Sequence, residues 1–82
     1  MESYNKLETL PYVRGLVQKL KHSQDRLRTE RGILSISLNA SYISPEEKNE
    51  LREIVSSFET WEDRIESLKK RVRGRIKLLE KL

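Results

Sequence analysis

The sequence predicts an all-α fold: an antiparallel hairpin of two helices that pairs with a second copy into a four-helix bundle or coiled coil. The chain has 82 residues with 3 Gly, 2 Pro and only 6% aromatic residues, too few turn-forming and β-forming residues for a sandwich or barrel. Two long segments instead carry apolar residues at helical spacing. Hydrophobic residues make up 35% and charged residues 37%, so one small domain over residues 1–82 has too little apolar material for a conventional enzyme core.

The second helix is predicted over residues 45–82. It starts with a capping box, in which Ser44 and Glu47 exchange side-chain hydrogen bonds with each other's amides and Pro45 occupies the first helical position. Apolar residues then recur at steps of three and four. These residues are the predicted core and dimer seam: Leu51, Ile54, Phe58, Trp61, Ile65, Leu68, Val72 and Leu79. Arg75 interrupts the seam, and Val55 and Ile76 widen it beyond what one neighbouring helix covers, so we expect a homodimer.

The first helix is predicted over residues 11–38. Its seam consists of six apolar and two polar residues: Leu10, Val13, Val17, Leu20, Gln24, Leu27, Arg31 and Leu34. Because a proline ring clashes with the carbonyl four residues earlier, Pro11 is expected to start the helix, which leaves residues 1–10 as a separate arm or turn. Residues 39–44 form the link.

The sequence pattern before the link fits two kinds of secondary structure. Apolar and polar residues alternate from Leu34 to Tyr42, which is the period of a strand. No second such run exists within the chain to pair with it. We therefore favour helix to about Leu38, and the alternative is an extended connection that pairs across a dimer.

Charge is distributed unevenly along the second helix. Residues 44–68 carry a net charge of −5 and residues 69–82 a net charge of +6, which complements the helix dipole and favours antiparallel over parallel self-pairing. Within the hairpin, a link centred near residues 40–44 would bring three arginines of the first helix near three glutamates of the second. The expected groups are Arg26, Arg28 and Arg31 with Glu50, Glu53 and Glu59. The open end of the hairpin is then left basic.

Catalytic chemistry is not indicated. The chain lacks cysteine and has one histidine, His22, so thiolate and multi-histidine sites are excluded and we expect no metal and no cofactor. The three glycines are far apart and form no phosphate-binding loop. The carboxylates of residues 46–66, Glu62 among them, are expected to be solvated. We predict that the protein is not an enzyme.

The most informative segment is the basic run of residues 69–77. As a plain structural feature it is a solvated helix end. If the run has a function, it contacts nucleic acid or an acidic partner together with cations of the first helix. The residues expected to make these contacts are Arg14, Lys19, Lys21, Lys69, Lys70, Arg73 and Lys77. A membrane-surface helix would need the seam exposed, which the dimer opposes. Without a secretory signal or an 18-residue apolar stretch, a soluble cytoplasmic protein is expected.

These observations rank three functions. The first is a dimeric helical adaptor or regulator that binds a protein partner through its outer charged faces, with its small size fitting a viral or phage origin. The second is a dimer that binds RNA or DNA without sequence specificity through the basic end. The third is a structural coiled-coil subunit of a larger assembly. In layout alone, the predicted architecture is similar to small dimeric hairpin bundles, such as the Rop-type RNA-binding regulators of plasmid copy number and small viral or phage adaptor proteins.

Overall fold

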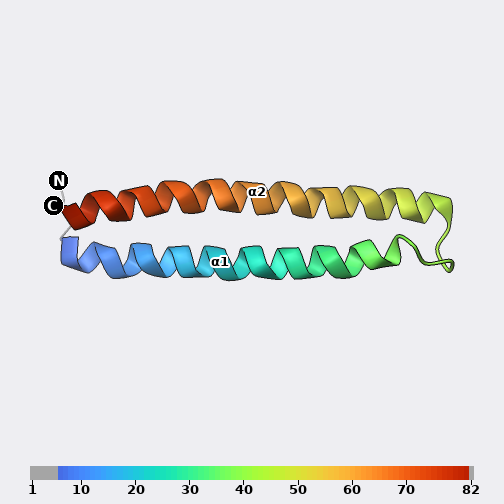
Figure 1. Cartoon of the computed structure of the whole chain (residues 1–82), viewed down its shortest axis with the longest axis horizontal. Helices are drawn as coiled ribbons and strands as arrows, with labels where there is room; N and C mark the ends of the chain where they lie inside the picture. Colours follow the sequence, from blue (N-terminus) through green and yellow to red (C-terminus); the bar gives the residue numbers. More distant parts are fainter. Residues whose placement is uncertain (1–5, 82) are drawn as a thin grey trace.

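The computed structural model describes residues 6–81 and consists of two long antiparallel helices joined by a short link (Figure 1). Helix α1 spans Lys6–Ser37 and helix α2 spans Pro45–Lys81. The hairpin is 58 Å long and only 19 by 18 Å across, and the open ends of the two helices lie together at one end (Figure 1). The predicted all-α hairpin is confirmed, and residues 6–81 contain no strand.

Helix α1 starts earlier than the position of Pro11 suggests. The predicted arm over residues 1–10 is helical from Lys6 onward, while residues 1–5 lie outside the described residues. Pro11 lies within the helix, and Leu10 beside it is buried. Pro11 is still close enough to the start of α1 for its missing N–H to affect only one early hydrogen bond.

The link and the start of α2 follow from local chemistry. Helix α1 ends at Ser37 and tightens into a 3₁₀-type turn, in which the amides of Leu38, Asn39 and Ala40 donate to carbonyls three residues earlier at 3.0–3.2 Å. The predicted capping box is present: the Ser44 amide donates to Glu47 Oε1 at 2.8 Å, and the Glu47 amide donates to Ser44 Oγ at 3.1 Å. Helix α2 therefore begins at Pro45, as predicted.

The interface between the helices is thin, since only two hydrophobic residues, Leu10 and Val72, are buried in the described part of the chain. The other apolar interior positions of both helices are half-buried. On α1 the less exposed positions follow the predicted seam. On α2 they recur at steps of four and three: Leu51, Val55, Phe58, Glu62, Ile65, Lys69, Val72, Ile76 and Leu79. Five of these residues belong to the predicted seam. The other three predicted seam residues, Ile54, Trp61 and Leu68, are exposed. Helix α2 is turned slightly, so that the residue after each of them, including Glu62 and Lys69, faces inward.

The pairing of the helices also differs from that expected for a link centred near residues 40–44. Arg28 and Arg31 do not meet Glu50, Glu53 or Glu59; both contact Glu62. At the open end, Arg14 pairs with Glu80. The reason is that α2 begins beyond the end of α1 (Figure 1), which moves every partner on α2 toward its carboxyl end.

Candidate interaction surfaces

A cluster of polar side chains occupies the middle of the interface between α1 and α2. We call it the polar layer, and its members are Gln24 and Arg31 of α1 with Glu62, Glu66 and Lys69 of α2. Gln24 is 4% exposed, and Glu62 and Lys69 are each 7% exposed. The expectation that Glu62 is solvated is therefore wrong.

Each member of the polar layer has a partner. Arg31 donates two hydrogen bonds to the Glu62 carboxylate, from Nε at 2.6 Å and from an Nη at 3.2 Å. Gln24 Nε2 donates to Glu66 Oε1 at 2.8 Å, and Lys69 Nζ donates to Gln24 Oε1 at 2.7 Å. No buried side-chain nitrogen or oxygen within the described residues lacks a hydrogen bond, so the layer is fully satisfied.

These contacts change the acidity of the carboxylates. Hydrogen bonds from Arg31 lower the pKa of Glu62, which overcomes the opposing effect of burial. Hydrogen bonds from Gln24 and then Lys69 lower the pKa of Glu66. The bond to Glu62 raises the pKa of Arg31 in turn. Both carboxylates of the polar layer are therefore ionised at neutral pH, and the hydrogen bonds that they accept are charge-assisted.

The polar layer explains the orientation of α2. Gln24 and Arg31 lie in the seam of α1, where Gln24 is buried and Arg31 is partly buried, so they need polar partners opposite. Glu62 and Lys69 supply them when they face inward. Trp61 and Leu68, each one residue earlier, then turn to the side of the hairpin.

The result is an exposed apolar strip, which we call the apolar flank: Ile54, Trp61 and Leu68 of α2 with Leu16 of α1. Trp61 is 52% exposed, and the other three are also partly exposed. Arg75 continues the α2 row and shares a hollow with Thr9 of α1, and Leu16 lies seven residues after Thr9 on the same row. The α1 and α2 members therefore lie on the same side of the hairpin.

A shallow groove of about 270 Å³ runs along the apolar flank beside Trp61. Its walls are Trp61, Arg64, Ile65, Ser67, Leu68 and Arg71. The Arg64 guanidinium carbon lies 4.6 Å from the centre of the Trp61 ring, a cation–π contact that covers part of the indole. The groove thus combines apolar walls with a basic rim.

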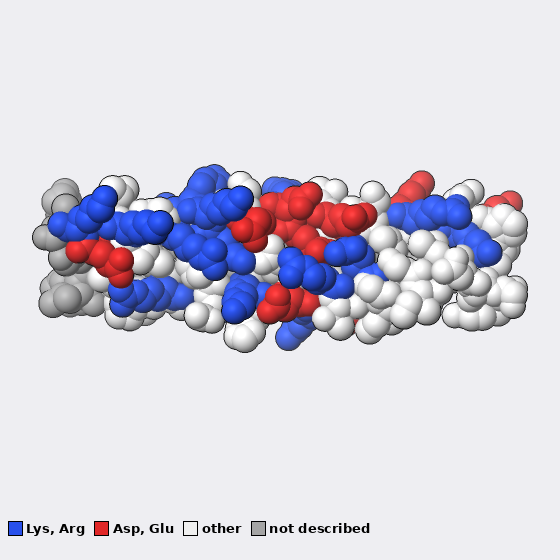
Figure 2. Space-filling model, in the orientation of Figure 1, with Lys and Arg blue, Asp and Glu red and all other residues white. Residues whose placement is uncertain are grey.

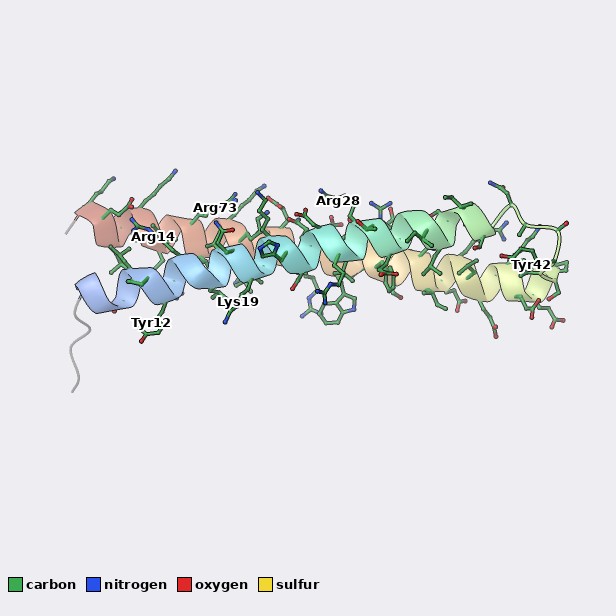
Figure 3. All side chains as sticks on the ribbon, turned by 90° about the horizontal axis from the view of Figure 1, so that it is seen from below. Tyr12, Arg14, Lys19, Arg28, Tyr42 and Arg73 are labelled. Carbon is green, nitrogen blue, oxygen red and sulfur yellow. The ribbon has the colours of Figure 1, made fainter. Side chains whose placement is uncertain are left out.

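The opposite side of the hairpin carries charge. Arg14, Arg28 and Arg73 lie along one side, whereas Tyr12 and Lys19 point to the other (Figure 3). Figure 2 shows one face of the hairpin, on which Lys and Arg are densest toward the open end of the helices and Asp and Glu gather near the middle. We call the side that carries Arg14, Arg28 and Arg73 the charged flank.

The structure separates the predicted basic residues. Lys69 is buried in the polar layer and is not available at the surface. Lys19 lies on the side opposite Arg14 and Arg73 (Figure 3). Arg14 is paired with Glu80, and Lys21, Lys70, Arg73 and Lys77 are exposed. No continuous patch unites all seven residues.

No family model matches the chain, and no curated protein or solved structure is significantly similar to it.

Other kinds of site find little support in the described part of the chain. Residues 6–81 contain no group of three or more His, Cys, Asp or Glu placed to hold a metal ion. His22 is exposed on α1. Neither α1 nor α2 has a stretch that is both apolar and long enough to cross a bilayer.

Proposed function

We propose that this protein is a non-enzymatic, dimeric helical interaction module, in which the apolar flank packs against a second copy and the charged residues outside it bind a protein partner. The observation that carries the proposal is the row of partly exposed Ile54, Trp61 and Leu68 on α2. Proteins of this size rarely obtain enough stability from one thin core and often gain the rest by oligomerising. Pairing the apolar flanks of two hairpins would give a four-helix bundle.

The protein partner is expected to dock on the outer charged residues. The acidic stretch of residues 46–66 and the basic stretch of residues 69–81 follow each other along α2 and offer two surfaces of opposite sign. Such patterning steers association and selects partners of complementary charge. This fits an adaptor or regulator, of the small kind that viruses and phages encode.

Sedimentation equilibrium tests the dimer. At micromolar concentration, we expect twice the chain mass of 9.7 kDa, and Leu68→Glu is expected to shift the mass toward one chain. Ile36→Glu is the matched control, because Ile36 is an exposed isoleucine of α1 outside the apolar flank. A well-folded wild-type protein with the mass of one chain would refute the proposal, and a mass above two chains would favour the structural coiled-coil subunit instead.

Charge reversal tests the docking surfaces. Arg73→Glu with Lys77→Glu is expected to abolish capture of partners that the wild-type protein retains. Lys19→Glu with Arg26→Glu is the matched control, because both are exposed cations of α1 outside the two stretches. Unchanged capture by the Arg73 and Lys77 variant would remove the basic stretch from the proposal.

A nucleic-acid-binding dimer is the second candidate. It is favoured by the placement of Arg14 and Arg73, which come from different helices and lie on the same side (Figure 3). Lys70 and Lys77 flank Arg73 at helical spacing, and together these groups could neutralise phosphates. Filter binding of duplex RNA and DNA at two salt concentrations decides: salt-sensitive retention that Arg73→Gln weakens supports this function, and no retention at low salt eliminates it.

A further inference from the structure

We propose that two copies pair antiparallel through α2, with the twofold axis passing beside Trp61. This inference rests on the proposed dimer and specifies its geometry. It follows from one row of residues spaced seven apart along α2, which run in a line in paired helices: Glu47, Ile54, Trp61, Leu68 and Arg75.

The row is complementary to its own reverse. When it is laid antiparallel on a second copy about Trp61, Ile54 meets Leu68 of the second copy and Glu47 meets Arg75 of the second copy. The same residues laid parallel and in register would put glutamate on glutamate and arginine on arginine. Like charges that face each other are destabilising, so the antiparallel arrangement is favoured.

The neighbouring row independently favours the antiparallel pairing. Glu50, Ser57, Arg64 and Arg71 lie next to the first row on its outer side, again seven residues apart. About the same axis, Glu50 meets Arg71 of the second copy, and Ser57 meets Arg64. A parallel pairing would oppose Arg64 to Arg64 and Arg71 to Arg71 along the rim of the groove.

The local shape of α2 agrees with an axis at Trp61. The groove beside Trp61 is open and has Leu68 in its wall, next to the position of the axis. The indole is half-exposed, so a second Trp61 can stack beside it once the two flanks meet. Burial of both rings at the axis removes the largest exposed aromatic surface of α2 from water.

Helix α1 of a second copy is less complementary to this row than α2 is. Its side of the apolar flank has Leu16, but Lys19 and Arg26 separate Leu16 from Ile33, the next large apolar residue there. Packing α2 onto α1 of a second copy would set Trp61 and Leu68 against these cations. Contact between the two α2 helices is therefore the core of the dimer, and α1 lies at its edge.

Disulfide cross-linking tests the geometry, since the chain has no cysteine of its own. Ile54→Cys and Leu68→Cys are made as separate single variants, one carrying a tag that changes its size, and are refolded together and oxidised. We expect a cross-linked heterodimer from the mixture and only background cross-linking from either variant alone. Strong cross-linking of Ile54→Cys or Leu68→Cys with itself would show a parallel pairing and overturn the inference.

A charge swap gives a second readout that does not depend on cysteine. Glu50→Arg is expected to weaken dimerisation about tenfold, and adding Arg71→Glu is expected to restore most of the affinity. Glu53→Arg, an exposed glutamate on neither row, is the control and should change little. No rescue by the double variant would overturn the antiparallel geometry.

The two proposals fail in different ways. A wild-type mass of one chain would refute the dimer itself. A wild-type mass of two chains without cross-linking between residues 54 and 68 would leave the dimer in place and overturn only its antiparallel geometry.

Discussion

The middle of the α1–α2 interface is polar, whereas its two ends are apolar. In the middle, Gln24 and Arg31 meet Glu62, Glu66 and Lys69 through short hydrogen bonds. Toward the open end, the interface contains Leu10 and Val72, the two buried hydrophobic residues of the described chain. The two regions therefore have different roles: the apolar ends hold the helices together, and the polar middle determines how they are aligned.

The energetic cost of sliding one helix along the other agrees with these two roles. An apolar contact tolerates sliding by a turn, because one leucine replaces another at little cost. A buried carboxylate that slides away from its arginine loses its partner and its water together. The polar layer therefore specifies one alignment of α1 on α2, much as a single buried polar residue fixes the register of a coiled coil.

Placing a charge in the apolar part of the interface should have the largest effect. Val72 is 2% exposed, and Val72→Asp buries a carboxylate with no partner, which costs at least about 3 kcal/mol and should leave the chain largely unfolded. Far-UV circular dichroism measures the loss of helix. Leu78→Asp puts the same charge on an exposed position of α2 and should keep the helical signal. Equal unfolding by both variants would mean that Val72 has no special place in the interface.

Removing one charge from the polar layer should have a smaller effect. Glu62→Gln weakens the bonds to Arg31 and Arg28 and should lower the free energy of unfolding by about 1–2 kcal/mol, seen as a melting temperature lower by roughly 5–10 °C. Glu59→Gln, exposed on the same helix, is the control. In a double-mutant cycle with Arg31→Gln, the combined loss should be smaller than the sum of the single losses. Additive losses would show that the two side chains are not coupled.

The sequence was sufficient to predict the hairpin and several of its details. Helix α1 has its less exposed positions on the predicted seam, including the polar members Gln24 and Arg31. The capping box at Ser44 and Glu47 predicted where α2 begins. These features depend on residues close together in the chain, so local chemistry and helical periodicity are enough to find them.

The orientation and alignment of α2 could not be predicted by counting apolar residues. Ile54, Trp61 and Leu68 are as apolar as Val55 and Ile76, so the periodicity allows either row to face inward. The deciding signal was on the other helix, where Gln24 and Arg31 required partners. Matching those two polar seam residues to Glu62 and Lys69 would have indicated that Trp61 faces the side of the hairpin.

The capping box should contribute about as much as one good helix cap. Ser44→Ala removes the acceptor of the Glu47 amide and should cost about 1 kcal/mol, measured by urea unfolding at fixed protein concentration. Ser41→Ala, an exposed serine of the link, is the control and should be nearly neutral. Since the cap lies at the end of α2 and far from the polar layer, its loss should add to that of Glu62→Gln. Non-additive losses would mean that the start of α2 and the polar layer form one cooperative unit.

Acid should selectively remove the part of the stability that depends on the charge of Glu62. The pKa of Glu62 is lowered in the folded chain from its ordinary value of 4.5, so its ionised form stabilises the fold above that pH and the contribution is lost as the pH falls through the lowered pKa. The stability gap between the wild type and Glu62→Gln should therefore be full near neutral pH and shrink in acid. A gap that stayed constant into acid would mean that Glu62 acts through its shape alone, and the polar middle would then align the helices without using its charge.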